Sequence, residues 1–313
     1  MVQQLLQSTA VAMACSVLVS GEQVLKQRPN FEGTWNSATT TPLERPPQLK
    51  NKPFFTREEA AEWERQYAKR NAEPTPEQLA NSKGTGTYNT FYREWGTRVV
   101  KTLRTSIITD PPDGRIPALT PEAEAIRRRR IEGIKNGENP EELGLQDQCL
   151  AFLTAGPPLL PYSYNSNYQI VQTDTAILVH AEMIHDARII HLDGRPHPPP
   201  SVRKWNGDSV GRWEANTLVV DTTNFNDRIA VQGSSAALHV VERFRRVSAE
   251  KILYQYTVDD PTTWTRPWSA EIPMMQTEGP LFEYACHEGN YGLVNILRGA
   301  RVADKEAART PQR

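Results

Sequence analysis

The chain has 313 residues, with 36 Lys and Arg against 37 Asp and Glu, which gives a formal net charge of -1. Because no region rich in both basic and aromatic residues is evident, this balance excludes nucleic acid as the expected partner. A hydrophobic fraction of 38% is enough for a core, whereas 24 prolines and 18 glycines indicate many turns. We expect one globular domain over residues 29–301, a length that suits a large β domain.

The N-terminus carries an apolar run, Thr9 to Val19, that ends at the small residues Ser20 and Gly21. A transmembrane helix needs about 20 apolar residues, so this run is too short to span a membrane. It is typical of a signal-peptide core, although no Lys or Arg precedes it. We expect residues 1–21 to be a signal peptide and the protein to be secreted, vesicular or periplasmic. An amphipathic N-terminal segment is the alternative, and no other stretch of the sequence is apolar enough to cross a membrane.

Three cysteines are present, and Cys15 lies within the expected signal peptide. Its removal would leave Cys149 and Cys286, and a cysteine pair in an exported chain is expected to form a disulfide. Two buried free thiols are the alternative. No C-x-x-C pair occurs, which disfavours a structural zinc site.

Residues 22–160 are expected to form an extended arm, helices and a first strand that pack on the core. The arm covers residues 29–55, which are rich in Pro, Thr and Asn. The β-branched, alternating segment Arg98–Thr109 predicts a strand. Capping residues predict helices that start after Thr56, Thr75 and Thr120, the last of which ends near Asn136-Gly137. Acidic neighbours favour a solvated face for the Arg127–Arg130 run in that helix.

After Pro161 the chain changes to short strand-like segments, with turn residues about every 8–12 residues. Asp193-Gly194 and Ala215-Asn216 are typical of hairpin turns. The expected strands are Tyr168–Thr173, Ala176–Met183, Arg188–Leu192, Arg212–Glu214, Thr217–Thr222, Leu238–Val247, Ile252–Val258, Arg266–Met275 and Leu281–His287. This spacing predicts a mainly β fold over residues 161–301, an antiparallel β-barrel that is lipocalin-like or related, followed by a disordered tail over 302–313.

The segment Gly207–Gly211 matches the G-x-S-x-G pattern of serine hydrolases, with Ser209 in the nucleophile position. A nucleophile elbow needs a helix after the serine, but strand-like residues follow here. A polar hairpin loop is therefore the favoured interpretation, and a serine hydrolase is a weaker alternative.

Several predicted strands carry ionisable side chains, and residues two apart on a strand share a face. Seven such residues come from four separate segments: Glu182, His185, Arg188, His239, Arg243, Glu283 and His287. If they face inward, they can act as a general acid/base set with shifted pKa values; if outward, they are surface charges. We expect at least four of the seven to line one cavity near Trp264 or Trp268. Glu242 lies on the opposite face of its strand from His239.

Aromatic residues near these strands either wall a small-molecule pocket or pack in the core. The candidates for substrate contact are Glu182, Trp205, Trp264, Trp268 and Tyr284. The sequence contains no dinucleotide-binding or phosphate-binding motif, and no H-E-x-x-H or His-x-His pattern. We therefore expect neither an organic cofactor nor a metal.

Several stretches together resemble a large, mostly uncharacterised group of exported bacterial proteins that is abundant in soil bacteria. They are Glu182–Arg188, Asp193–Arg195, Trp205–Glu214, Thr217–Thr222, Leu238–Arg243, Asp260–Trp268 and Ala285–Tyr291. The resemblance runs from about Asn30 to Arg301. It departs from the group at Ala215-Asn216, where Gly-Asp is usual, but both are turn pairs. The resemblance implies export and no particular activity.

More distantly, and only in kind, the profile is similar to fungal secreted pericyclases such as the hetero-Diels–Alderases of natural-product pathways, which are exported and cofactor-free. The first hypothesis is therefore a cofactor-independent enzyme of secondary metabolism, which cyclises, isomerises or dehydrates a hydrophobic small molecule in the barrel mouth.

In this hypothesis His185, His239 or His287 moves a proton, and Glu242 or Glu283 orients it. Arg188 or Arg243 polarises a carbonyl, while Trp264 and Trp268 shape the pocket. An exported small-molecule carrier without catalysis is the alternative.

Overall fold

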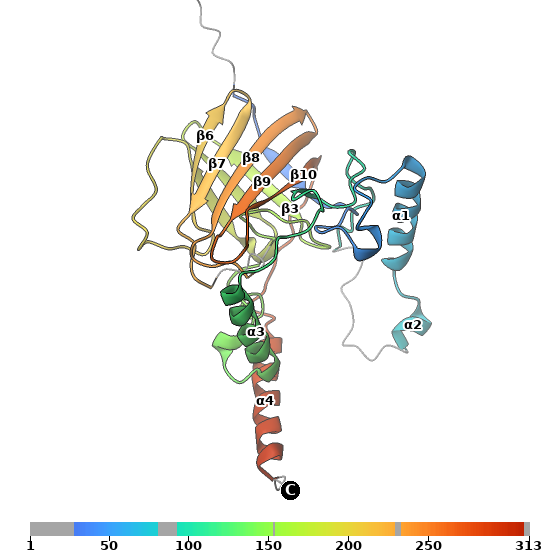
Figure 1. The fold of residues 1–313 in the computed structure, drawn as a ribbon, viewed down its shortest axis with the longest axis vertical. Coiled ribbons are helices and arrows are strands. Elements are labelled where there is room, and N and C mark those ends of the chain that lie inside the picture. The colour runs from blue at the N-terminus through green and yellow to red at the C-terminus, as the bar shows by residue number, and fades with distance from the viewer. Residues whose placement is uncertain (1–27, 81–92, 153, 229–232, 310–313) are drawn as a thin grey trace, which may run out of the picture.

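The computed structural model describes residues 28–80, 93–152, 154–228 and 233–309. Within them, nine strands close into a barrel in the order β1-β3-β4-β5-β6-β7-β8-β9-β10, with β10 pairing back onto β1 (Figure 1). The strands are β1 (Gly33–Asn36), β3 (Asn167–Gln172), β4 (Ala176–Ala181), β5 (Ala187–His191), β6 (Asp208–Glu214), β7 (Thr217–Thr223), β8 (His239–Ser248), β9 (Lys251–Asp259) and β10 (Trp268–Thr277). Neighbouring strands of the barrel are antiparallel except β5 and β6, which run parallel. The mainly β barrel expected from the sequence is confirmed, with one parallel pair.

Turn residues account for part of this topology. The β6–β7 hairpin pairs Glu214 with Thr217 across the predicted turn, where Ala215 adopts a φ of 54°. Asp193-Gly194, in contrast, does not close a hairpin, because β5 and β6 are parallel and need a long crossover between them. The expected loop Gly207–Gly211 is also wrong, since β6 begins at Asp208.

Helices α1 (Arg57–Arg70), α2 (Pro76–Ala80) and α3 (Pro121–Asn136) begin where the capping residues predict. The Thr56 hydroxyl accepts a hydrogen bond from Glu59 N at 3.2 Å, and the Glu59 carboxylate accepts one from Thr56 N at 2.8 Å. Helix α3 ends at Gly137, whose φ of 58° suits a glycine. Short 3-10 helices are η1 (Pro47–Leu49), η3 (Pro140–Glu142) and η4 (Met183–His185).

Four segments differ from the sequence predictions. Of Arg98–Thr109, only the end belongs to a strand, β2 (Ile108–Asp110), because Leu103 takes a φ of 59° that breaks the extended chain. The expected arm contributes β1, which closes the barrel. Leu281–His287 forms no strand, and helix α4 (Tyr291–Arg309) occupies most of the expected tail.

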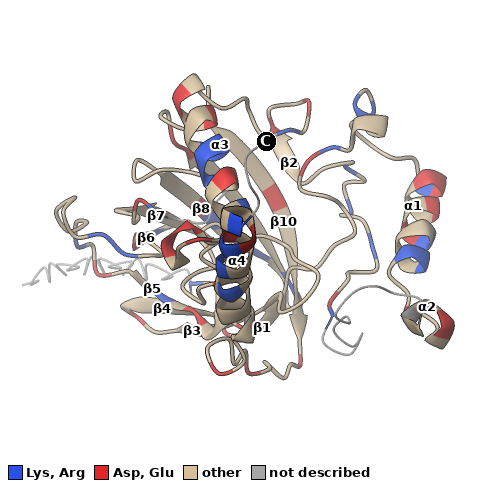
Figure 2. Ribbon diagram, turned by 90° about the horizontal axis from the view of Figure 1, so that it is seen from below, with Lys and Arg blue, Asp and Glu red and all other residues tan. Residues whose placement is uncertain are grey.

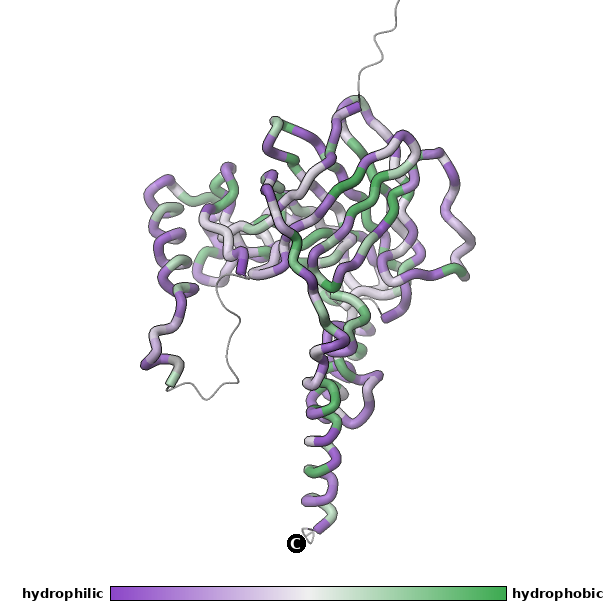
Figure 3. Tube along the Cα trace, turned by 180° about the vertical axis from the view of Figure 1, so that it is seen from behind, coloured by the Kyte–Doolittle hydropathy of each residue, from purple (hydrophilic) through white to green (hydrophobic). Residues whose placement is uncertain are grey.

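A cluster of buried hydrophobic side chains fills the interior of the barrel. Hydrophobic and hydrophilic residues alternate along the barrel strands (Figure 3). Trp264 and Trp268 pack edge to face inside, with ring centroids 5.9 Å apart. Residues 154–161 contact the barrel interior: Leu159 N donates to the Tyr254 hydroxyl at 2.9 Å, and the Tyr168 hydroxyl donates to the Thr154 carbonyl at 2.8 Å. The space between Phe31, Phe244 and their neighbours admits no water-sized molecule. Trp264 and Trp268 are both buried in the hydrophobic core, which fits the core-packing alternative rather than the walls of a ligand cavity.

Helix α4 runs away from the barrel, and its middle contacts the end of α3 (Figure 1). Arg301 donates a hydrogen bond to the Glu138 carbonyl at 2.6 Å. Charges of both signs cover α1, α3 and α4 (Figure 2), and the exposed Arg127 lies 3.5 Å from Glu124. No helix in the described ranges is both long and apolar enough to span a membrane.

Candidate functional site

Most of the predicted site residues lie in three separate places rather than around one cavity, and Trp205 and His287 lie apart from all three. Arg188 and Glu242 face the barrel interior, while His239 and Arg243 face outward from β8. Glu182, His185, Glu283 and Tyr284 lie where the chain after β10 passes the outer wall. Trp205 is half-buried in the turn before β6, and His287 is exposed in the turn before α4. The expectation that four of the seven ionisable residues line one cavity near Trp264 or Trp268 is wrong, because strand alternation turns them to different faces.

The barrel interior contains a buried ion pair. Both terminal nitrogens of Arg188 donate to the Glu242 carboxylate at 2.6 Å, and the Tyr254 hydroxyl donates to the same carboxylate at 2.7 Å. Burial alone would lower the pKa of Arg188, but the charge of Glu242 outweighs it and the pKa is raised. Because both side chains are buried and bonded to each other, this pair belongs to the packed interior of the barrel.

Ser209, the residue of the G-x-S-x-G match, belongs to the same interior network. Its hydroxyl lies 3.0 Å from the Thr222 hydroxyl and 3.5 Å from a terminal nitrogen of Arg188, and its exposed fraction is 3%. No imidazole is among these partners. A buried hydroxyl without a neighbouring base has no means of activation, which argues against a hydrolase.

The outer face of β6, β7 and β8 carries a second ionic network. His239 Nε2 lies 2.9 Å from Asp221, and His197 lies 3.1 Å from both Asp208 and Asp221. The hydrogen bond to Asp221 raises the pKa of His239 against the opposing effect of burial. On the same face Arg243 pairs with Glu214 at 2.9 Å. The contacts of His197 with Asp208 and Asp221 hold the loop before β6 against the barrel.

The third place is the outer wall of β1, β3 and β4, which the segments around Glu94 and Phe282 contact. Glu182 is fully buried there. Its carboxylate accepts hydrogen bonds from Phe282 N at 2.7 Å and from the Asn167 amide at 2.8 Å. Close by, Tyr284 N lies 3.3 Å from a ring nitrogen of His185. Residues far apart in the sequence therefore meet on this wall.

Glu94 is the second carboxyl group at this wall. The Asn167 amide also approaches Glu94 at 3.2 Å, so one side chain links the two carboxyl groups. Burial, and next the charge of Glu182, raise the pKa of Glu94. A carboxyl group with a raised pKa keeps its proton at higher pH than usual, which is the property of a general acid.

Two cavities lie on this wall, and Phe282 lines both of them, whereas Glu94 lines only the smaller one. The smaller, of about 280 Å³, is lined by Glu94, Asn167 and Asn36 among others. The larger, of about 540 Å³, is lined by Tyr164, Glu283, Tyr284 and Asn290 among others. The larger volume is in the range of small-molecule sites, and aromatic walls with a few polar groups are typical of them.

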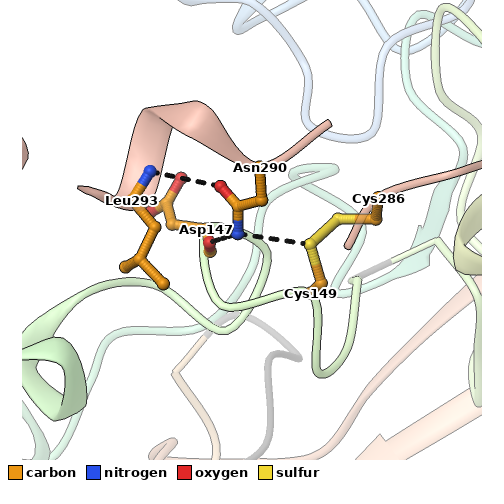
Figure 4. The surroundings of a disulfide bond; sticks show 5 residues. All are labelled: Asp147, Cys149, Cys286, Asn290 and Leu293. Carbon is orange, nitrogen blue, oxygen red and sulfur yellow. Dashed lines mark hydrogen bonds between the residues drawn. A yellow bond between two sulfur atoms is a disulfide. The ribbon is translucent and has the colours of Figure 1, made fainter. Parts of the chain in front are cut away.

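A disulfide holds the wall of the larger cavity in place. Cys149 and Cys286 are bonded with their Cα atoms 5.8 Å apart, which confirms the predicted disulfide (Figure 4). Asn290 adds a hydrogen bond from its amide to the Asp147 carbonyl at 2.7 Å, also drawn in Figure 4. Because Cys286 itself lines the cavity, the bond fixes the position of the segment that encloses it.

The residues that sequence reasoning missed are Glu94, Asn167 and Phe282. Asn167 stands one position before the predicted strand at Tyr168, so a polar residue at a strand start was its only signal. Glu94 lies in a segment without periodicity, and nothing in the sequence links it to Glu182.

Comparison with known proteins adds no family to this description, since neither protein-family models, nor curated proteins, nor solved structures gave a match. Within the described residues, no group of three or more His, Cys, Asp or Glu side chains is arranged to hold a metal ion.

Proposed function

We propose that this protein is a cofactor-independent enzyme that binds a hydrophobic small molecule on the outer wall of its barrel and transfers a proton to it from Glu94. The observation that carries the proposal is the linked pair of carboxyl groups, one of which lines a cavity that shares Phe282 with a larger, aromatic cavity. The reaction class is an isomerisation, cyclisation or dehydration, since each of these can begin with protonation of a carbonyl or hydroxyl oxygen.

The roles of the residues follow from their contacts. Glu94 donates its proton to an oxygen atom of the substrate, and the Asn167 amide holds the carboxylate that remains. That carboxylate then lies near the charge of Glu182, which favours the return of a proton. In an isomerisation or a cyclisation the protonated intermediate returns a proton from another atom as it forms the product. In a dehydration the protonated hydroxyl group first leaves as water, and a neighbouring C–H then returns the proton, so in each case Glu94 is regenerated and no cofactor is consumed.

The test starts from a panel of hydrophobic compounds with carbonyl or hydroxyl groups, screened for those that raise the melting temperature. Each bound compound is incubated with the protein and analysed by mass spectrometry for isomeric products or loss of water. We expect Glu94→Gln to retain binding and to lower turnover about 10²- to 10⁴-fold. The matched control is Glu250→Gln, an exposed carboxylate on the β8–β9 turn that lines neither cavity.

Two results would contradict this proposal. Recovery of every bound compound unchanged would favour the carrier without catalysis. Full turnover by Glu94→Gln would place the chemistry elsewhere.

A further inference from the structure

The linings of the two cavities differ from an ordinary hydrophobic pocket because they include acidic side chains. Two carboxyl groups lie in them, Glu283 in the larger cavity and Glu94 in the smaller. No Lys, Arg or His is among the described residues that line either cavity. Glu182, fully buried behind Asn167, adds a further negative charge to the wall. Among the described residues, the negative charges of the site are therefore those of Glu283 and Glu182, because Glu94 holds a proton in the proposed reaction.

Glu283 has no ion-pair partner among the residues that the structure describes. Its neighbours in the chain, Phe282 and Tyr284, line the same cavity, and Tyr164 contributes a third aromatic ring. Aromatic rings attract a cation through their negative faces, and a carboxylate attracts it through its charge. The combination favours a ligand that carries a positive charge and an apolar part.

We propose that the substrate is a hydrophobic amine, bound as an ammonium cation in the larger cavity between Glu283 and the aromatic side chains. This inference rests on the proposed function and names the substrate class of the same site. The ammonium group lies in the larger cavity, and the part of the molecule that receives a proton reaches past Phe282 to Glu94. A carboxylate substrate is excluded by the charge of the wall.

Three probes of similar size test this assignment at about pH 8 by fluorescence titration. They are benzyltrimethylammonium, its neutral carbon isostere neopentylbenzene and the anion phenylacetate. We expect the ammonium probe to bind about tenfold more tightly than the neutral isostere, and phenylacetate to bind more weakly still. Glu283→Gln should remove this preference and leave the affinity for neopentylbenzene unchanged.

Glu288→Gln is the matched control, because Glu288 is exposed on the same segment and does not line the cavity. Equal binding of the charged and neutral probes would overturn the amine assignment, and so would no binding of the ammonium probe at millimolar concentration. Neither result touches the proton transfer, which the Glu94→Gln turnover measurement tests separately.

Discussion

The barrel interior and the outer wall both contain buried carboxylates, but the hydrogen-bond partners of these carboxylates differ between the two regions. Inside, Glu242 meets Arg188 in two short hydrogen bonds and also accepts one from Tyr254, with packed side chains around them. On the outer wall, Glu182 accepts hydrogen bonds from neutral N–H donors, and its charge acts on Glu94 beside a cavity. A carboxylate that is fully paired contributes to the fold. Glu94, which lies near a second carboxyl group, has a raised pKa and can therefore take part in proton transfer.

This contrast also places the candidate site outside the barrel, whereas the sequence led us to expect it in the barrel mouth. Barrels of this size often hold a ligand inside, whereas here the interior is solid and the ligand-sized spaces lie outside. The barrel acts as a rigid support, and the segments that pass over it supply the candidate site. Variants in the two regions test this difference between the packed interior and the outer wall.

The largest effect is expected from Glu242→Leu. The substitution leaves the buried Arg188 guanidinium without its carboxylate, which should cost about 3–5 kcal/mol of the free energy of unfolding. Urea denaturation measures this loss. The double variant Arg188→Met, Glu242→Leu should recover most of it, and a loss below about 1 kcal/mol in the single variant would contradict the role given to the pair.

Removal of the disulfide should have the next largest effect. The variant Cys149→Ala, Cys286→Ala loses a cross-link over 137 residues, which should cost about 2–4 kcal/mol in denaturant unfolding. Hydrogen exchange should show faster exchange at the Phe282 and Tyr284 amides, with β8 still protected. Unchanged exchange at those two amides would mean that the disulfide does not hold the cavity wall.

Ser209→Ala should have a smaller effect, confined to stability. Loss of the hydrogen bond with Thr222 should cost about 1 kcal/mol, and turnover should stay nearly intact because Ser209 lies inside the packed barrel. A loss of activity above about a hundredfold in a folded variant would restore the serine-hydrolase alternative.

The smallest effect concerns pH and the exposed network around His239. Because its folded pKa is raised above the ordinary value, His239 stabilises the fold fully below about pH 6.5. This contribution is lost as pH rises through the folded pKa. Solvent screening limits it to about 0.2–1 kcal/mol.

Unfolding of the wild type and His239→Gln should therefore differ at low pH and converge at high pH. Arg243→Gln is the control, since an arginine keeps its charge across this range. A difference that grows with rising pH would give the opposite sign and contradict the assignment.

Local patterns in the sequence predicted the parts of the fold that depend on near neighbours. The Thr56–Glu59 capping box, the Ala215-Asn216 turn and the opposite faces of His239 and Glu242 all depend on residues within a few positions of one another. The disulfide could be predicted because only two cysteines remained. Hydrophobic alternation also predicted most strands of the barrel to within two residues.

The candidate site depends on contacts that no local pattern records. Asn167 meets Glu94 across 73 positions, and Glu182 meets Phe282 across 100. The parallel pairing of β5 and β6 was hidden by the turn-like Asp193-Gly194, because a turn signal does not reveal which strand follows it in space. Glu94 has no periodic neighbours, so only the folded chain shows that it lies near a second carboxyl group.

In the proposed function Glu94 is a proton-holding group on the outer wall, and titration of Glu94 tests this role. Carbon-13 NMR of the glutamate side chains, assigned with Glu94→Gln, gives the pKa of Glu94 in the intact protein. We expect a pKa above the ordinary glutamate value, and a lower one in Glu182→Gln because the neighbouring charge is removed while burial remains. An ordinary pKa in the wild type, unchanged by Glu182→Gln, would contradict the account.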